Sequence, residues 1–197
     1  MKLDSATIGR YKGFTLMELL VVIAVLAILL TITIVAMNPA EIFAQARDTQ
    51  RITDMEAMQK AIELYVSNAP GSANLQAGAG FTCGTHFGSS ASGVTSPFAA
   101  PTLARAGIRT TDGNGWIAID FDNSHYGAPF GQIPEDPTNS ATSFYAYSCD
   151  QTNKKFELDT NLESAKFRNG GENDLESNDT GNNSDLYEIG SDPGLDL

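Results

Sequence analysis

The chain has 197 residues, of which 42% are hydrophobic, and its formal net charge at pH 7 is −12. This length allows one domain of ordinary size and an appendage. Residues 1–13 hold Lys2, Arg10 and Lys12 against Asp4, a net of +2, so the remainder carries −14. An acidic domain repels phosphate backbones, which argues against direct binding of nucleic acid.

A long apolar run follows this basic segment. Residues 19–40 contain no charged side chain and are mostly Leu, Ile, Val and Ala. As a helix they would extend about 33 Å, enough to cross the hydrocarbon core of a bilayer. The basic residues before the run, with Glu41 and Asp48 beyond it, predict an N-terminus in the cytoplasm. Everything after Ala40 is then expected on the outer side.

Four kinds of N-terminal segment could contain such a run. A secretory signal peptide has a shorter apolar stretch, although the A-x-A match at residues 44–46 would give a mature start at Arg47. A simple membrane anchor explains the length but not the acidic residue Glu18. The core helix of a soluble protein needs an apolar surrounding that the rest of the chain lacks. The fourth kind is indicated by the residues around Gly13.

Residues 12–20, Lys-Gly-Phe-Thr-Leu-Met-Glu-Leu-Leu, resemble the leader junction of type IV pilins and of type II secretion pseudopilins. In that family a prepilin peptidase cuts after the glycine and methylates the new terminal amine, and the fifth mature residue is a glutamate. The resemblance covers about residues 10–38. It implies cleavage after Gly13, methylation of Phe14 and a role for Glu18 in assembly.

This resemblance implies a structural filament subunit and not an enzyme. Its expected partners are further copies of the chain, the prepilin peptidase and the inner-membrane assembly machinery. The alternative is a membrane-anchored or Sec-secreted extracytoplasmic binding protein or enzyme, although the chain has no G-x-S-x-G or H-E-x-x-H motif. Whether the filament would be a pilus or part of a type II secretion system stays open, although the resemblance in the C-terminal region is nearest to type II secretion major pseudopilins.

Physical chemistry gives an independent reason for Glu18. A carboxylate within a membrane helix costs roughly 2.5–3.5 kcal/mol or more, so it needs a partner. Cleavage would turn the neutral amide of Phe14 into a cationic amine, and methylation keeps that charge. We expect Glu18 of one subunit to pair with the Phe14 amine of a neighbour, which would fix the axial register. The alternative is a carboxylate that reaches back to water at the membrane edge.

The fold predicted for the whole chain is α+β, with a long N-terminal helix packed on a small antiparallel sheet. Pro39 disfavours helical geometry at Asn38 and predicts a break there. From Ala40 to about Ser67 the pattern is that of an amphipathic helix, with Glu56 and Lys60 as an ion pair on its outer side. Its apolar stripe consists of Ile52, Met55, Met58, Ile62 and Tyr65.

Three segments predict strands: residues 116–121, 144–149 and 155–158, the last two joined by turn residues at 150–153. The stretch 71–115 is too long for a bare loop and must contain short strands or turns. The expected parts are a cytoplasmic leader (1–13), a transmembrane and filament-core helix (14–39), the amphipathic half of the helix (40–68) and an extracytoplasmic sheet domain (69–197).

The two cysteines, Cys83 and Cys149, both follow the apolar run and so belong to the part expected outside the cytoplasm. A disulfide between them is favoured there. Two free thiols are one alternative. A zinc site completed by His86 and His125 is another, but those four residues are scattered widely along the chain.

The C-terminal region is strongly acidic, with eight Asp or Glu residues and no basic residue among the last 29. Hard oxygen ligands at this density suit a structural Ca²⁺ ion. We expect the proposed function to require no cofactor. Residues 170–175 resemble the calcium loop of major pseudopilins, which places a ligand at Asp174. The candidate ligands are Asp174, Glu172, Asn178, Asp179 and Asp185. A disordered acidic tail and a metal-free fold are the alternatives.

Overall fold

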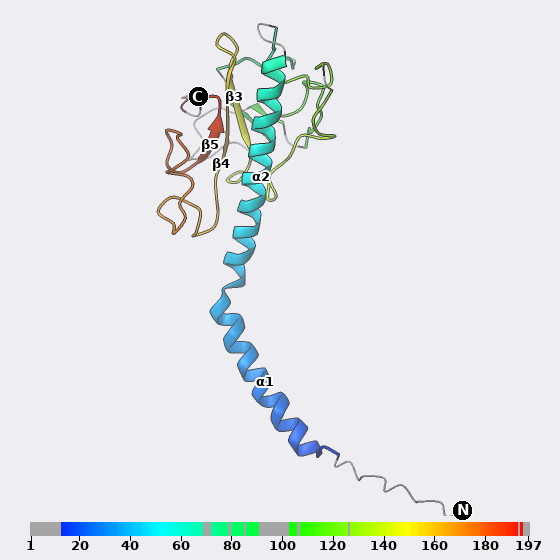
Figure 1. Ribbon diagram of the computed structural model, residues 1–197, viewed down its shortest axis with the longest axis vertical. Helices are drawn as coiled ribbons and strands as arrows, with labels where there is room; N and C mark the ends of the chain where they lie inside the picture. The colour runs from blue at the N-terminus through cyan, green and yellow to red at the C-terminus, as the bar shows by residue number, and fades with distance from the viewer. Residues whose placement is uncertain are drawn as a thin grey trace, which may run out of the picture. The chain divides into compact units, whose positions relative to one another are not determined.

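The computed structural model of the chain describes residues 13–68, 72–78, 80–84, 86–90, 103–105, 107–125, 127–192 and 194. Within them lie two helices, α1 (Leu16–Met37) and α2 (Pro39–Asn68) (Figure 1). The strands are β1 (Phe87–Gly88), β2 (Leu103–Ala104), β3 (Ala146–Asp150), β4 (Lys155–Thr160) and β5 (Tyr187–Gly190). The chain divides into two compact units, Met1–Ala40 and Glu41–Leu197.

The first unit contains α1, a helix that exposes apolar side chains on every side. Thr15 caps its N-terminus, because the Thr15 hydroxyl accepts a hydrogen bond of 3.2 Å from the N–H of Glu18. None of its residues is buried. Thr31 and Thr33 donate their hydroxyls to carbonyls of the same helix, so neither needs a polar partner outside it. By length and composition, α1 can cross a membrane.

The predicted break between the helices is confirmed at Asn38. Asn38 has a φ of 42°, in the left-handed region, and ends α1. Pro39 is the first residue of α2, where its missing N–H removes no helical hydrogen bond. The proline ring disfavours right-handed helical geometry at the preceding residue, and asparagine tolerates the left-handed alternative.

The second unit contains α2 from Glu41 onward, and the apolar stripe of this helix joins the side chains of the sheet in one core. Met55, Met58 and Ile62 have no exposed surface, and they share a cluster with sheet residues such as Tyr147 and Leu158. Outside this core, Glu56 and Lys60 form the expected ion pair, with 3.1 Å between carboxylate and ammonium. The α+β fold class predicted from the sequence is confirmed.

The sheet has the strand order β2-β1-β3-β4-β5. Neighbouring strands are antiparallel except β1 and β2, which pair in parallel through two residues each. The β3–β4 hairpin uses the predicted turn, where the Asp150 carboxylate accepts hydrogen bonds from the N–H groups of Thr152 and Asn153. In the stretch 71–115, β1 and β2 supply the short strands expected there, and residues 91–102 lie outside the described part.

The strand predicted at residues 116–121 is wrong. The only ladder contact of this segment, among the described residues, is an isolated bridge between Asp112 and Asp120. Residues 116–119 are all buried, so their burial does not alternate as in a half-buried strand. The Trp116 ring N–H donates to the carbonyl of Pro134 at 2.8 Å. The segment is enclosed on both sides, which the alternating sequence pattern does not predict.

A buried guanidinium connects α2 to two loops. The Arg51 side chain has no exposed surface and contacts Asp48 at 2.8 Å, Asp136 at 2.6 Å and Glu163 at 2.6 Å. Asp48 also accepts hydrogen bonds from the N–H groups of Glu163 and Ser164. Burial acts to lower the pKa of Arg51, but these acids outweigh it and the net shift is upward. Arg51 therefore stays charged and fixes both loops on α2.

Candidate functional site

The junction between Gly13 and Phe14 lies just ahead of α1. A Cβ atom placed on Gly13 would meet no atom within 4 Å, so nothing in the fold requires glycine there. The Phe14 side chain is 84% exposed. The peptide bond between these residues is therefore outside regular secondary structure and next to open space. The remaining leader residues, 1–12, lie outside the described part of the chain.

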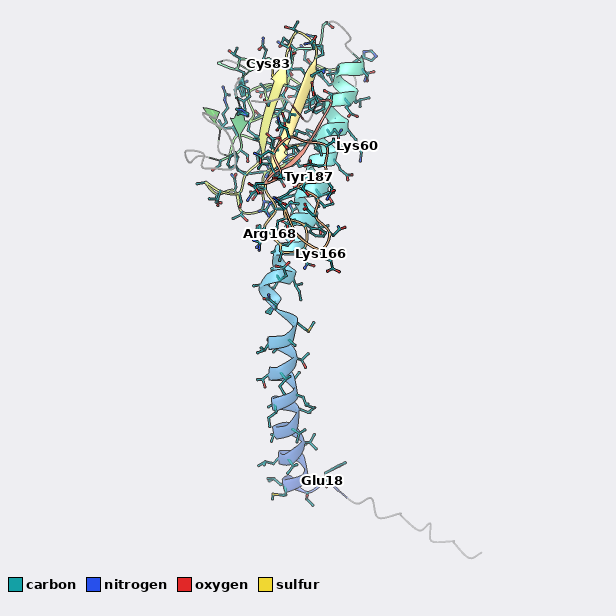
Figure 2. The ribbon with its side chains drawn as sticks, turned by 90° about the vertical axis from the view of Figure 1, so that its left-hand side faces the viewer. Glu18, Lys60, Cys83, Lys166, Arg168 and Tyr187 are labelled. Atoms are coloured by element: carbon teal, nitrogen blue, oxygen red, sulfur yellow. A yellow bond between two sulfur atoms is a disulfide. The ribbon has the colours of Figure 1, made fainter. Side chains whose placement is uncertain are left out.

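Glu18 lies in the first turn of α1 (Figure 2). A carboxylate at this position is stabilised by the partial positive charge of the helix N-terminus. Among the described residues, no side chain donates a hydrogen bond or forms an ion pair with the Glu18 carboxylate. The group is exposed in the single subunit and available to a cation from outside it.

These residues fall within one recognisable motif. Residues 8–34 match the prokaryotic N-terminal methylation motif. The chain has the N-terminus of a type IV pilin-like prepilin. The matched segment contains Gly13, Phe14 and Glu18 and most of α1. No curated protein sequence and no solved structure shows significant similarity to the chain.

The motif has direct functional implications. Proteins that carry it are processed by prepilin peptidase and assemble into filaments, so the motif points to a structural subunit that this peptidase processes. Together with the apolar helix α1, the motif is consistent with a membrane-anchored, single-pass protein. The individual roles of Gly13, Phe14 and Glu18 stay predictions.

The two cysteines are joined in a disulfide, Cys83–Cys149. The bond links the segment before β1 to β3, the central strand of the sheet, and Cys83 is labelled in Figure 2. Neither sulfur is free, so the zinc site and the pair of free thiols are both excluded. His86, one of the proposed zinc ligands, is buried, and burial lowers its pKa.

Asp174 organises the loop that resembles the calcium loop of major pseudopilins. Its carboxylate accepts hydrogen bonds from the N–H of Gly170 at 2.8 Å, the N–H of Ser177 at 2.9 Å and the Ser177 hydroxyl at 2.6 Å. The bonds from Ser177, and after them the bond from Gly170, lower the pKa of Asp174. The Asn178 amide donates to the Asp174 carbonyl, which closes the turn.

The other candidate calcium ligands are distributed around this loop. Glu172 is exposed, and Asp185 accepts a hydrogen bond of 3.3 Å from the Asn169 amide. Asp179 accepts from the N–H groups of Gly181 and Glu188, which holds the loop against β5. The structure thus gives Asp174, Asp179 and Asp185 separate partners, and coordination of Ca²⁺ by the predicted set stays a prediction.

The acidic C-terminal region is folded across residues 169–192. Leu186 is buried, and the buried Glu176 carboxylate accepts hydrogen bonds from the N–H groups of Leu162 and Asn169. The disordered tail is therefore wrong for this stretch, whereas residues 195–197 lie outside the described part. Acidic side chains here cap backbone groups within the fold.

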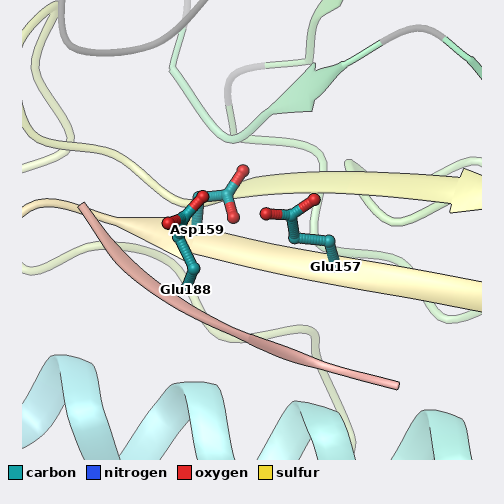
Figure 3. Close-up of side chains that lie close together, drawn as sticks. All are labelled: Glu157, Asp159 and Glu188. Carbon is teal, nitrogen blue, oxygen red and sulfur yellow. The ribbon is translucent and has the colours of Figure 1, made fainter. Parts of the chain in front are cut away.

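Sequence reasoning missed a group of three buried carboxylates, Glu157, Asp159 and Glu188 (Figure 3). They come from β4 and β5, and one oxygen of each lies within 4.8 Å of the others. The available signal was the alternation of acidic and apolar residues over 156–159. Such alternation is typical of a strand with a solvent-facing side, so it pointed to exposed acids.

Proposed function

We infer that the mature subunit begins at Phe14 and assembles through α1 into a type IV pilus-like filament. The observation that carries this function is the match to the N-terminal methylation motif at a helix that buries none of its apolar residues. In water such a helix would expose a large apolar surface, which is stable only in lipid or against other apolar helices. A bundle of α1 helices satisfies this requirement after the subunit leaves the membrane.

The proposed orientation places the N-terminus in the cytoplasm and residues after Ala40 in the periplasm, or outside the cell in the assembled filament. Two features support it. The basic residues of the leader favour the cytoplasmic side. The Cys83–Cys149 disulfide lies in the second unit, and disulfides persist in oxidising compartments outside the cytoplasm.

Within the filament class, the proposed role is that of a major pseudopilin in type II protein secretion. Support comes from the sequence of residues 170–175, which resembles the calcium loop of major pseudopilins, and from the position of Asp174, whose carboxylate accepts hydrogen bonds from Gly170 and Ser177 within that loop. A pilus used for adhesion, motility or DNA uptake is the second candidate, because the N-terminal motif is shared by both kinds of filament.

The N-terminus of the mature protein tests the filament proposal. Intact-mass and N-terminal peptide analysis of protein from its native cell should find a methylated Phe14. Gly13→Val should leave unprocessed precursor in the membrane. Gly131→Val is the matched control, because a Cβ at Gly131 also meets no atom within 4 Å. A mature start at Arg47, or uncut chains in assembled filaments, would contradict the proposal.

Deletion of the gene in its native cell separates the two filament types. A pseudopilin is required for export, so its loss should leave secreted proteins in the periplasm while surface pili remain. A pilin subunit should show the reverse, with pili lost and secretion intact. The second pattern would overturn the secretion role and leave the filament proposal standing.

A further inference from the structure

Glu157, Asp159 and Glu188 form a compact carboxylate cluster on two paired strands. Glu157 and Asp159 are two residues apart on β4, so their side chains leave the same side of the strand. Glu188 on β5 is the direct cross-strand partner of Asp159. The three residues are only 2%, 5% and 3% exposed, and their carboxylates point toward one another (Figure 3).

The cluster lies on the face of the sheet opposite the main core. Phe156 and Leu158 alternate with the acids along β4 and belong to the core cluster that contains the α2 side chains. The acids therefore point away from α2. Ser148 on β3 is the cross-strand partner of Glu157 and shares their face. The sheet thus places three carboxylates and a hydroxyl on one buried surface.

Several oxygens on this surface have no hydrogen-bond partner. Glu157 Oε2, Asp159 Oδ1 and Ser148 Oγ are buried without one. None of the ion pairs formed among the described residues includes a carboxylate of the cluster. Buried charges of one sign are strongly unfavourable unless something neutralises them, and buried polar atoms nearly always have a partner.

The loop before β5 holds Glu188 in a fixed position. The Glu188 Oε2 atom accepts a hydrogen bond of 2.7 Å from the N–H of Asn183, and the backbone N–H of Glu188 donates to the Asp179 carboxylate at 2.6 Å. Gly181 lies against the same carboxylate, since a Cβ on Gly181 would approach Glu188 Oε2 to 2.1 Å. The backbone thus closes over one side of the cluster and orients one of its acids.

Either protons or a metal cation can neutralise such a cluster. Burial, and after it the neighbouring carboxylates, raise the pKa values of Glu157 and Asp159, so protons compete for the site when no cation is present. Two protons would let the three acids hydrogen-bond to one another, in addition to the bond that Glu188 accepts from Asn183. A cation would engage all three acids together with the unpartnered oxygens. The preformed spacing favours the cation.

We propose that Glu157, Asp159 and Glu188 bind a Ca²⁺ ion. Ca²⁺ accepts six to eight oxygen ligands at about 2.3–2.6 Å, so oxygens on opposite sides of one ion can be about 5 Å apart. The spacing within the cluster fits this limit. Mg²⁺ holds its ligands closer and usually keeps several waters, which a buried, all-protein site does not provide. This site is distinct from the Asp174 loop and would fasten β4 to β5.

Thermal unfolding of the full chain in detergent, after treatment with EGTA, tests the site. Wild-type protein should melt at a higher temperature in millimolar Ca²⁺ than in EGTA, because an ion that binds only the folded state stabilises it. Mg²⁺ at the same concentration should give a smaller shift. Asp159→Asn should abolish the Ca²⁺ shift. Asp174→Asn, in the neighbouring loop, should retain it.

Calorimetric titration with Ca²⁺ supplies an independent measurement. Glu188→Gln should weaken binding by at least about tenfold, the scale of loss seen even for residues that only support a metal ligand. In EGTA, Asp159→Asn and Glu188→Gln should each melt at or above the wild-type temperature, because each removes one of the buried like charges. Loss of Ca²⁺ binding can therefore be distinguished from loss of the folded structure. No Ca²⁺ shift in the wild type would overturn the proposal. So would a shift that survives in Asp159→Asn but is lost in Asp174→Asn.

Discussion

Arg51 is the residue on which the charge balance around α2 depends. Its guanidinium forms ion pairs with Asp48 and Asp136, whose side chains have no exposed surface. Both acids also accept backbone hydrogen bonds, Asp136 from the N–H groups of Thr138 and Asn139. A buried ion pair adds little net stability over an apolar contact, but loss of one partner leaves an uncompensated charge in a poorly solvated place.

Arg51→Met should therefore destabilise the protein by roughly 3–5 kcal/mol, measured by urea unfolding at neutral pH. Lys60→Met is the matched control, because Lys60 pairs with Glu56 at the surface, where 72% and 51% of the two side chains are exposed. That control should leave the free energy of unfolding nearly unchanged. Equal losses for the two variants would contradict a special role for the buried network.

Glu163 makes the same network sensitive to acid. Hydrogen bonds from Arg47, and then from Arg51, lower its pKa from 4.5 to about 2. The unfolded chain therefore binds a proton more readily than the folded one in this range. The stabilisation from Glu163 is complete above about pH 4.5 and is lost as the pH falls toward 2.

Melting temperatures between pH 6 and pH 2 should show this loss in the wild type. Glu163→Gln cannot ionise at this position, so its melting temperature should fall less steeply over the same range. A matching slope for the two proteins would assign the acid sensitivity to other carboxylates.

At the scale of whole elements, the disulfide connects a segment of little regular structure to the middle of the sheet. Residues 80–84 belong to no helix or strand, and the Gly84 N–H donates a hydrogen bond of 3.1 Å to the Cys149 carbonyl. The disulfide closes a span of 66 residues. Such a long closed loop restricts the unfolded chain far more than the folded one.

Replacement of Cys83 and Cys149 together by serine should lower the free energy of unfolding by roughly 4 kcal/mol, the chain-entropy expectation for a loop of this size. The wild type treated with a reducing agent should show a similar loss, which separates the missing bond from the effect of the serines. Urea unfolding of the three samples gives the comparison. A difference below about 1 kcal/mol would mean that the unfolded chain is already restricted here.

The elements that could be predicted from the sequence are those set by neighbouring residues. The apolar run, Pro39, the stripe of α2 and the β3–β4 turn all depend on short-range patterns, and all four are present. Strand β5 was missed because it pairs with β4 across residues 161–186. Residues 116–121 were assigned to a strand because alternation cannot reveal that both sides of the segment are covered.

The same distinction between short-range patterns and long-range pairing separates the candidate sites that the sequence reveals from those that it does not. Gly13, Phe14 and Glu18 could be identified because they lie within a short contiguous motif. The carboxylate cluster could not, since it exists only when Glu188 is placed opposite Asp159 by strand pairing. An acidic residue near the C-terminus has no visible partner in a sequence, and its burial depends on the loop that folds over it.

At the scale of the proposed filament, we expect Glu18 to supply the charge that neighbouring subunits must match. Glu18→Ala should insert into the membrane at least as well as the wild type, because a charge leaves the apolar helix. Assembly should nevertheless fall, because the terminal amine of a neighbouring Phe14 would lose its counter-charge. Sheared filaments, quantified against total membrane-bound subunit, measure both effects.

Thr33→Ala is the matched control for this experiment. Thr33 also carries a polar group in α1, but its hydroxyl is bonded to the Leu29 carbonyl of the same helix. Its loss should change neither insertion nor assembly. Normal filament yield and register for Glu18→Ala would remove the pairing role of this residue.

The even distribution of apolar residues around α1 also affects how specifically it can pack. A helix with one polar face has a preferred rotation about its long axis, because one side must turn toward water. No residue of α1 is buried within the subunit, so the single chain sets no such preference for it. Rotating the helix among similar neighbours would exchange one aliphatic surface for another at little cost. In the proposed filament, we therefore expect the rotation of each subunit about the axis of α1 to be set by the single charge of the helix, Glu18, and by contacts between the folded domains.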